Sequence, residues 1–146
     1  DWPVHDTLWA ATSSSDSLLD RILIVHRYLE GSGLDAGSQL LRRLQVDEEG
    51  TSRLVVEQIV REEVGHVEFG SRWYREICRS EGLDPELDFP RRMKELRWQL
   101  PRRTEKIVRE LRRKAGFSEA EIDYLEELRR EFLSPLKILS GDIKHH

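Results

Sequence analysis

Glu63 and His66 are the two residues whose types and spacing point most clearly to chemistry. Side chains three residues apart on a helix project from one face, so this carboxylate and imidazole can reach the same metal ion. In heptad register the pair interrupts a stripe formed by Val56, Ile59, Gly70, Trp73 and Ile77. An ionised carboxylate on a buried face is costly unless it is compensated. A bound cation would compensate it, and so would an Arg or Lys partner.

Glu30 is the second candidate ligand, and His26 is a weaker one. Both continue a line that starts at Leu19 and Leu23 on one side of the first expected helix. The helix dipole disfavours an acid in the last turn, which favours a functional role for Glu30 over a solvated helix end. Two alternatives stay open, because a lone Glu-x-x-His is a weak motif. Glu30 can simply end the helix in solvent, and a buried His is often satisfied by a carboxylate.

Together these residues match one half of a known ligand pattern. Di-metal carboxylate sites in helical bundles take a Glu from each of two helices and a Glu-x-x-His from each of two others. Glu30 followed by Glu63 and His66 supplies one Glu and one Glu-x-x-His. Carboxylates combined with imidazoles suit iron or manganese better than copper or a closed zinc site. The sequence therefore predicts half of a centre for iron, or for iron and manganese.

The sequence around these residues resembles a bacterial ferritin-like family catalogued as domain of unknown function 455. The similarity covers most of the chain, and the Glu-Val-Gly-His-Val block followed by Gly-x-Arg-Trp is its most specific part. The matching stretches are Asp6-Thr7-Leu8-Trp9, Leu29-Glu30, Gly33-Leu34-Asp35, Arg61 to Val67, Gly70-Ser71-Arg72-Trp73-Tyr74, Gly82-Leu83-Asp84-Pro85 and Lys114-Ala115-Gly116-Phe117-Ser118. This resemblance implies a ferritin-like bundle with Glu30, Glu63 and His66 as metal ligands. It implies little about the reaction.

The chain also departs from that family. Its members resemble longer proteins with two further helices upstream, which carry another Glu and another Glu-x-x-His. Nothing before Asp16 supplies these residues, and the similar spacing Asp142-x-x-His145 lies in the C-terminal tail. Gly31-Ser32 stands where a small-basic pair is usual, and His26 stands where a proline is expected.

Three arrangements follow from this half-set of ligands. A two-fold homodimer would bring together four Glu and two His, which completes a di-metal set. Alternatively, a separate chain or an N-terminal half supplies the missing ligands. In the third arrangement the site is vestigial, and His26 or a neighbouring Arg pairs the carboxylates. The first expected helix is apolar nearly all round and therefore needs a partner. This need favours the first two arrangements.

Helical patterns dominate, so we expect one all-α domain over residues 1–146. The family resemblance implies that this domain is a ferritin-like half-bundle, which a second chain would complete. It divides into a lead-in (1–15), the metal-site helices (16–80) and a C-terminal helical extension (81–146). Ser15 or Asp16 is expected to cap the first helix, which runs to Glu30 and ends or kinks at Gly31-Ser32-Gly33. A short helix over 38–44 follows.

Thr51 or Ser52 is expected to cap the long helix, which runs over 52–80 and stops at Gly82 and Pro85. Residues 83–90 are expected to form a loop, followed by a charged helix over 91–99. Another helix is expected to begin or kink at Pro101 and to run to Lys114, with Gly116 as its stop. Ser118 and Glu121 form a capping-box pattern for a last helix that ends near Phe132 or Leu133.

Composition limits the compartment and the partners. The only cysteine, Cys78, excludes an intrachain disulfide and is expected to be a small buried residue. No apolar run approaches the roughly 20 residues of a membrane span, and no signal peptide is evident. We therefore expect a cytoplasmic protein without membrane contact. The chain begins with Asp, as a processed product or part of a longer protein would, and His145-His146 has the look of a tag remnant.

One segment is strongly basic. Residues 91–115 contain eleven Lys or Arg and three Glu, within a chain whose net charge is −4. Such asymmetry can mark a surface that binds polyanions. A solvated helix face is the favoured interpretation, because Trp98 is the only aromatic residue that could stack on a base there. Nucleic acid is therefore a possible partner but not a favoured one.

Three functions compete at this stage. The first is a di-iron or iron–manganese oxidoreductase that uses oxygen on an unknown small-molecule substrate. The second is a non-catalytic binding protein with an incomplete metal site, which contacts RNA or an acidic partner through residues 91–115. The third is iron storage or detoxification. Gly65 and Gly70 either leave room beside the metals or allow close helix packing. Core packing is favoured over a redox role for the nearby aromatic residues Tyr28, Trp73 and Tyr74.

Overall fold

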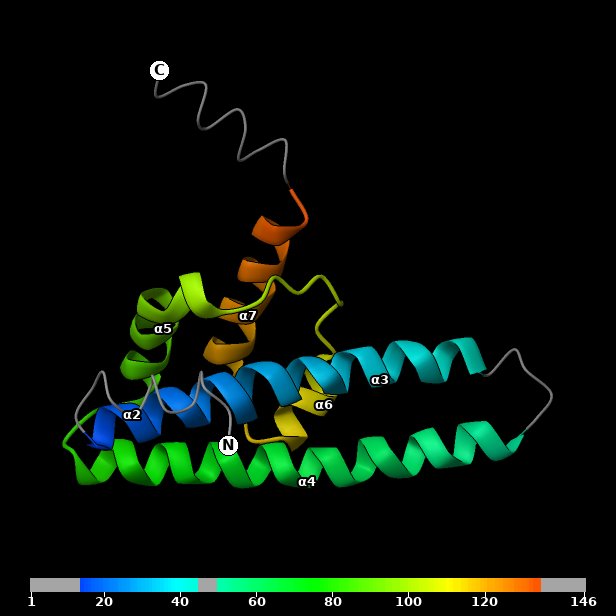
Figure 1. The fold of residues 1–146 in the computed structure, drawn as a ribbon, viewed down its shortest axis with the longest axis horizontal. Coiled ribbons are helices and arrows are strands. Elements are labelled where there is room, and N and C mark those ends of the chain that lie inside the picture. Colours follow the sequence, from blue (N-terminus) through cyan, green and yellow to red (C-terminus); the bar gives the residue numbers. More distant parts are fainter. Residues whose placement is uncertain (1–13, 45–49, 135–146) are drawn as a thin grey trace, which may run out of the picture.

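The computed structural model describes residues 14–44 and 50–134 (Figure 1). Its elements are α2 (Ser14–Arg21), η1 (Ile22–Glu30), α3 (Gly31–Leu44), α4 (Gly50–Ser80), α5 (Pro85–Leu96), η2 (Arg97–Gln99), α6 (Arg109–Lys114) and α7 (Glu119–Phe132). No strand occurs among the described residues. The expected all-α helical bundle is therefore confirmed. Residues 1–13 of the expected lead-in and the Asp142-x-x-His145 spacing lie outside the described residues, and the first helix already begins at Ser14.

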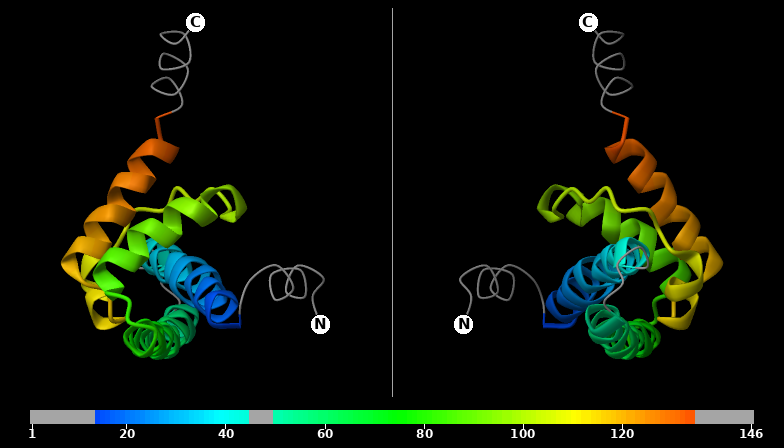
Figure 2. Two further views of the ribbon diagram at one scale, coloured as in Figure 1. Left: turned by 90° about the vertical axis from the view of Figure 1, so that its left-hand side faces the viewer. Right: turned by 90° about the vertical axis from the view of Figure 1, so that its right-hand side faces the viewer.

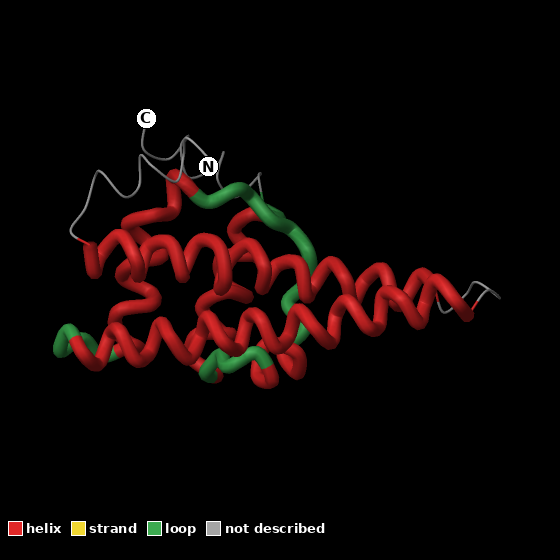
Figure 3. Tube along the Cα trace, turned by 60° about the horizontal axis from the view of Figure 1, so that its bottom comes forward, coloured by secondary structure: helices red, strands yellow, loops and turns green. Residues whose placement is uncertain are grey.

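A long helical hairpin forms the base of the structure. The elements α2, η1 and α3 follow one another without a break, and we call them together the N-terminal rod. The rod lies alongside α4, and the far end of this hairpin projects beyond the other helices (Figures 1 and 3). Leu19, Leu23 and Leu34 on the rod and Val60 and Val67 on α4 belong to one buried core. The expected long helix is confirmed, although it already includes Thr51 and Ser52.

The expected break at Gly31-Ser32-Gly33 is wrong, and so is the separate short helix over 38–44. Gly31 has helical dihedral angles, with φ −60° and ψ −41°. Its role is close approach, because a Cβ at Gly31 would lie 2.4 Å from Nη1 of Arg112. A Cβ at Gly37 would likewise lie 2.7 Å from Cγ2 of Val60. Glycine is needed here for space rather than for an unusual backbone conformation.

The rod changes its helical form where the candidate ligands lie. Residues Ile22–Glu30 adopt a π-helix, between α-helical segments on both sides. π-Helical segments are rare and often occur at functional sites. In this chain the π-helix carries His26 near its middle and Glu30 at its end.

The helices after α4 form a layer on one side of the hairpin (Figure 2). We call α5, α6 and α7 the C-terminal layer. Residues 83–90 were expected to be a loop, but α5 begins at Pro85. The Asp84 side chain accepts a hydrogen bond of 3.0 Å from the Glu86 N–H and so caps the helix. Pro85 occupies the first helical position, where its missing N–H costs nothing, so it starts a helix instead of only ending one.

The expected helix from Pro101 to Lys114 is also wrong over most of its length. Residues 100–108 are not helical, and α6 covers only Arg109–Lys114. Side chains from other elements form hydrogen bonds with the backbone N–H and carbonyl groups of this segment. The Tyr28 hydroxyl donates to the Pro101 carbonyl, the Val108 N–H donates to Asp35, and Arg129 donates to the Glu105 carbonyl. These tertiary hydrogen bonds replace the helical ones.

Three expected helix ends are confirmed. Gly82 and Gly116 follow α4 and α6 with φ of 72° and 86°, a conformation that favours glycine. After each glycine the next N–H bonds back to the helix, from Leu83 to the Cys78 carbonyl and from Phe117 to the Arg112 carbonyl. The Ser118–Glu121 capping box is present at the start of α7.

Buried ion pairs fasten the C-terminal layer to the hairpin. Arg27 on the rod donates to both carboxylate oxygens of Glu121 on α7, each at 2.8 Å. Arg112 on α6 donates to Asp35 at 2.7 Å, and both side chains are fully buried. Arg92 on α5 bonds to Asp20 on the rod and to Asp88 on its own helix. Apart from Arg92–Asp88 within α5, these pairs join elements far apart in the sequence, so together they fix the position of the layer.

The heptad stripe through Glu63 and His66 is not a buried face. The buried side chains of α4 are instead Val60, Val67, Ser71, Tyr74 and Cys78. Ile59 and Trp73 are 56% and 50% exposed. With Val55 and Phe69 they form a line of exposed apolar side chains on α4, which we call the outer stripe. Within the described ranges, no helix is both long and apolar enough to cross a membrane.

Candidate metal centre

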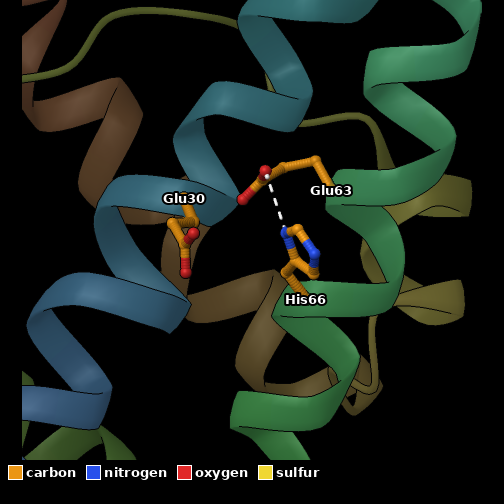
Figure 4. Close-up of side chains that lie close together, drawn as sticks. All are labelled: Glu30, Glu63 and His66. Carbon is orange, nitrogen blue, oxygen red and sulfur yellow. Dashed lines mark ion pairs between the residues drawn. The ribbon is translucent and has the colours of Figure 1, made fainter.

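The structure brings the three principal candidate ligands together. Glu30 ends η1, while Glu63 and His66 lie one turn apart on the facing stretch of α4 (Figure 4). Each offers one donor atom, and these atoms all lie within 4.8 Å of one another. In the described part of the chain, no other group of three or more His, Cys, Asp or Glu side chains lies close enough together to hold one metal ion.

The three donors differ in exposure. The side chains of Glu30 and Glu63 are 29% and 27% exposed, whereas His66 is 66% exposed. Nδ1 of His66 lies 3.5 Å from Oε2 of Glu63. The site therefore sits at the edge of the hairpin, with its carboxylates partly enclosed and its imidazole open to the outside.

Glu63 carries the clearest sign of an unmet charge. Its Oε1 atom is buried, and no described residue hydrogen-bonds to it. Burial and the nearby carboxylate of Glu30 raise the pKa of Glu63 above its ordinary value, against a lowering by His66. Among the described residues, the two carboxylates form ion pairs with histidines only, Glu30 with His26 and Glu63 with His66. A divalent cation fits this donor set, because it would neutralise both carboxylates and occupy the unpaired oxygen.

His26 lies beside the cluster but does not belong to it. Its Nδ1 atom is 2.5 Å from Oε1 of Glu30. The group of mutually close donors contains Glu30, Glu63 and His66 without His26. The interpretation of His26 as a metal ligand thus gains no support from the geometry, which instead gives it a hydrogen bond to a candidate ligand.

The other residues considered from the sequence have different surroundings. Gly70 makes room for His26, because a Cβ there would lie 2.5 Å from the His26 Cβ. A Cβ at Gly65 would meet nothing within 4 Å. Tyr28 and Tyr74 are buried and donate hydrogen bonds to Pro101 and Asp88, outside the metal cluster. Sequence reasoning missed the contact between Gly70 and His26, because no local pattern links positions on two different helices.

The basic segment of residues 91–115 is largely neutralised by acids. Eight of its eleven cationic side chains form ion pairs with Asp or Glu: Arg91, Arg92, Arg97, Arg103, Arg109, Arg112, Arg113 and Lys114. Arg109, for example, contacts Glu119, Asp123 and Glu126 of α7. Proximity in space therefore removes most of the charge asymmetry that the linear sequence suggests.

Fold and site together define an all-α protein with a carboxylate–histidine cluster between two long helices. The chain belongs to the family described as protein of unknown function DUF455, which matches residues 1–123. It is similar to an uncharacterized protein from Haemophilus influenzae, with 28% identity over 138 residues. The match covers 94% of this chain and 47% of the relative, so the chain spans about half the relative's length. No solved structure matches the chain significantly.

Proposed function

We propose that this chain provides half of a carboxylate-bridged di-metal centre in a ferritin-like helical bundle. The assembled protein would be an oxidoreductase that uses oxygen on a small-molecule substrate, with iron or iron and manganese as its metals. The observation that carries this proposal is the convergence of Glu30, Glu63 and His66 within 4.8 Å, together with the unpaired, buried Oε1 of Glu63.

The donor types support iron or manganese over other metals. Two carboxylates and one imidazole are hard to intermediate ligands, and no thiolate is present in the cluster. Metals bound by such a set supply oxygen activation and one-electron chemistry, while the protein supplies ligand geometry and a shielded cavity. In this chain Glu30, Glu63 and His66 would hold the metals.

The outer stripe supports completion of the bundle by further helices. Val55, Ile59, Phe69 and Trp73 are exposed apolar residues at helical spacing on the helix that carries His66. Exposed apolar surface of this kind is characteristic of a face that another element covers. The relative from Haemophilus influenzae is about twice as long as this chain. We therefore propose that a complementing half covers the stripe and adds the remaining ligands. Its length would be about that of the part of the relative that this chain does not match.

A second copy of this chain is the competing way to complete the site. Sedimentation velocity of the chain alone and of the chain co-expressed with a complementing half separates the two. A heterodimer that holds two metals supports the complementing half. A metal-loaded homodimer of the chain alone overturns that part of the proposal and supports the two-fold arrangement.

The proposed chemistry is tested by the reaction of the assembled, iron(II)-loaded protein with oxygen. We expect a limited oxidation of about two iron ions per centre, followed by consumption of oxygen only when a reductant is supplied. Continued oxidation and retention of many iron ions per centre would support iron storage instead. An absence of oxygen-dependent oxidation would contradict the proposed oxidoreductase. No structural observation favours RNA binding, since most of the basic segment is paired with acids.

A further inference from the structure

His26 occupies a prepared place between the two long helices. A Cβ added to Gly70 would lie 2.5 Å from the Cβ of His26 and 3.1 Å from its Cγ. A side chain at position 70 would therefore clash with the His26 Cβ, which is fixed to the backbone, and would force the rod and α4 apart at this point. The His26 side chain is partly buried, with 39% of its surface exposed.

The same imidazole engages Glu30 from outside the donor cluster. Nδ1 of His26 lies 2.5 Å from Oε1 of Glu30, so the two side chains share a close hydrogen bond. A carboxylate has two oxygens with about four lone-pair sites, so this bond leaves capacity for a metal ion. It also restricts rotation of a side chain that is otherwise flexible. The bond therefore favours one orientation of the Glu30 carboxylate.

We propose that His26 is a positioning residue that aims Glu30 at the metal site and is not itself a metal ligand. This inference rests on the proposed function, because it assumes that Glu30 binds a metal. Hydrogen-bonded partners of metal-binding carboxylates hold the ligand in its binding orientation. Gly70 belongs to the same device, since its lack of a side chain allows His26 to stay in contact with Glu30.

Three substitutions at position 26 separate positioning from direct ligation. The amide nitrogen of Asn occupies nearly the same place as Nδ1 of His, whereas that of Gln reaches the place of Nε2. His26→Asn should therefore keep the hydrogen bond to Glu30 and bind manganese(II) within a few-fold of the parent. His26→Ala and His26→Gln should weaken manganese(II) binding about 10- to 100-fold, the usual effect of losing such a partner. The measurement is a competition titration with a chelator, using the assembled protein.

A pair of glycine substitutions provides a matched test on α4. Gly70→Ala should shift the rod segment that carries His26 and Glu30 away from α4, and so should weaken manganese(II) binding at least as much as His26→Ala. Gly65→Ala lies on the same helix but meets nothing within 4 Å, so it should bind like the parent. Equal binding by Gly70→Ala and Gly65→Ala would contradict the role given to Gly70 and His26.

Long-range proton–nitrogen NMR tests the hydrogen bond without any metal. In the metal-free protein, at a pH where the imidazole is neutral, the proton of His26 should be on Nδ1. Glu30→Ala should return it to Nε2, the form that free imidazole side chains prefer. A proton on Nε2 in the parent would overturn the proposal, as would loss of metal binding in His26→Asn together with His26→Ala. Failure of the proposed function has a separate signature, because the parent itself would then bind no manganese(II).

Discussion

Two buried or partly buried carboxylates, Glu121 and Glu63, show how differently the two sides of the hairpin are built. Glu121 faces the C-terminal layer interface and accepts hydrogen bonds from Arg27 and Arg75 at 2.8 Å. Burial acts to raise its pKa, but these arginines outweigh it and hold the pKa below the ordinary value. Glu63 has no arginine partner among the described residues, and its pKa is raised. The first carboxylate is compensated by arginines within the chain, whereas the second has only His66 as an ion-pair partner among the described residues.

The apolar residues of the two sides differ in the same way. On the closed side, the Arg27 guanidinium lies 5.0, 4.8 and 4.4 Å from the ring centres of Tyr74, Phe89 and Phe117. These rings are buried, and they shield the ion pair from water. On the open side, Phe69 and Trp73 contact each other edge to face while both remain half exposed. We infer that the closed interface is complete, whereas the open face is the one that other helices cover.

The largest effect is expected where the closed side is broken. Glu121→Ala leaves Arg27 buried without its partner, so the free energy of unfolding should fall by about 3–5 kcal/mol. Urea denaturation measures this loss. Glu119→Ala is the control on the same helix, because Glu119 is an exposed partner of Arg109 and Arg113. Exposed pairs contribute about 0–1 kcal/mol, so similar losses in both variants would contradict the importance given to the buried pair.

A smaller effect should appear in acid. Burial raises the pKa of Asp88, but hydrogen bonds from Arg92 and Tyr74 more than offset this and lower it below 3.8. A carboxyl whose pKa is lowered by folding stabilises the native state above its unfolded pKa, and this contribution is lost as pH falls through the folded pKa. We therefore expect the stability of the parent to fall below about pH 4. Asp88→Asn should be less stable near neutral pH and should show a shallower acid loss in urea titrations between pH 5 and 2.

The smallest effect should come from the open side, with the opposite sign. The pKa of Glu63 is raised above 4.5, so the native state binds this proton more tightly than the unfolded state does. Its contribution to stability is present below pH 4.5 and is lost as pH rises through the higher folded pKa. In the metal-free protein, Glu63→Gln should therefore be at least as stable as the parent at neutral pH. A clear destabilisation there would show that the Glu63 charge is already compensated.

Local signals in the sequence were enough to predict much of the fold. The capping box at Ser118, the stops at Gly82 and Gly116 and the long helix with its Glu-x-x-His depend on neighbouring residues, and these predictions agree with the structure. The proximity of Glu30 to Glu63 and His66 was also expected, because these residues match half of the ligand pattern of di-metal helical bundles and the family resemblance implies the same set. Their role as metal ligands stays a prediction.

Features set by tertiary contacts could not be predicted in this way. Gly31 is helical, and the space of its missing side chain is taken by Arg112, 81 positions further along, so glycine at this position marks close packing and not a helix end. Residues 100–108 are not helical because Tyr28, Asp35 and Arg129 bind their backbone. The charge excess of the basic segment could not be weighed from the sequence, because several of its acidic partners lie on other elements, such as Asp35 on α3 and Glu119 and Glu131 on α7. Likewise, the outer stripe looked like a buried face because heptad spacing does not say which element covers it.

The most direct test of the central claim is an anaerobic titration with manganese(II) and iron(II), done with the C-terminal His145-His146 removed. The parent, Glu63→Ala, His66→Ala and the control Glu62→Ala are compared, each assembled with its complementing half. Glu62 is exposed and bonded to Gln58, next to the site but outside it. We expect metal binding by the parent and by Glu62→Ala, and none by Glu63→Ala or His66→Ala. Equal binding by all four proteins would contradict the metal site.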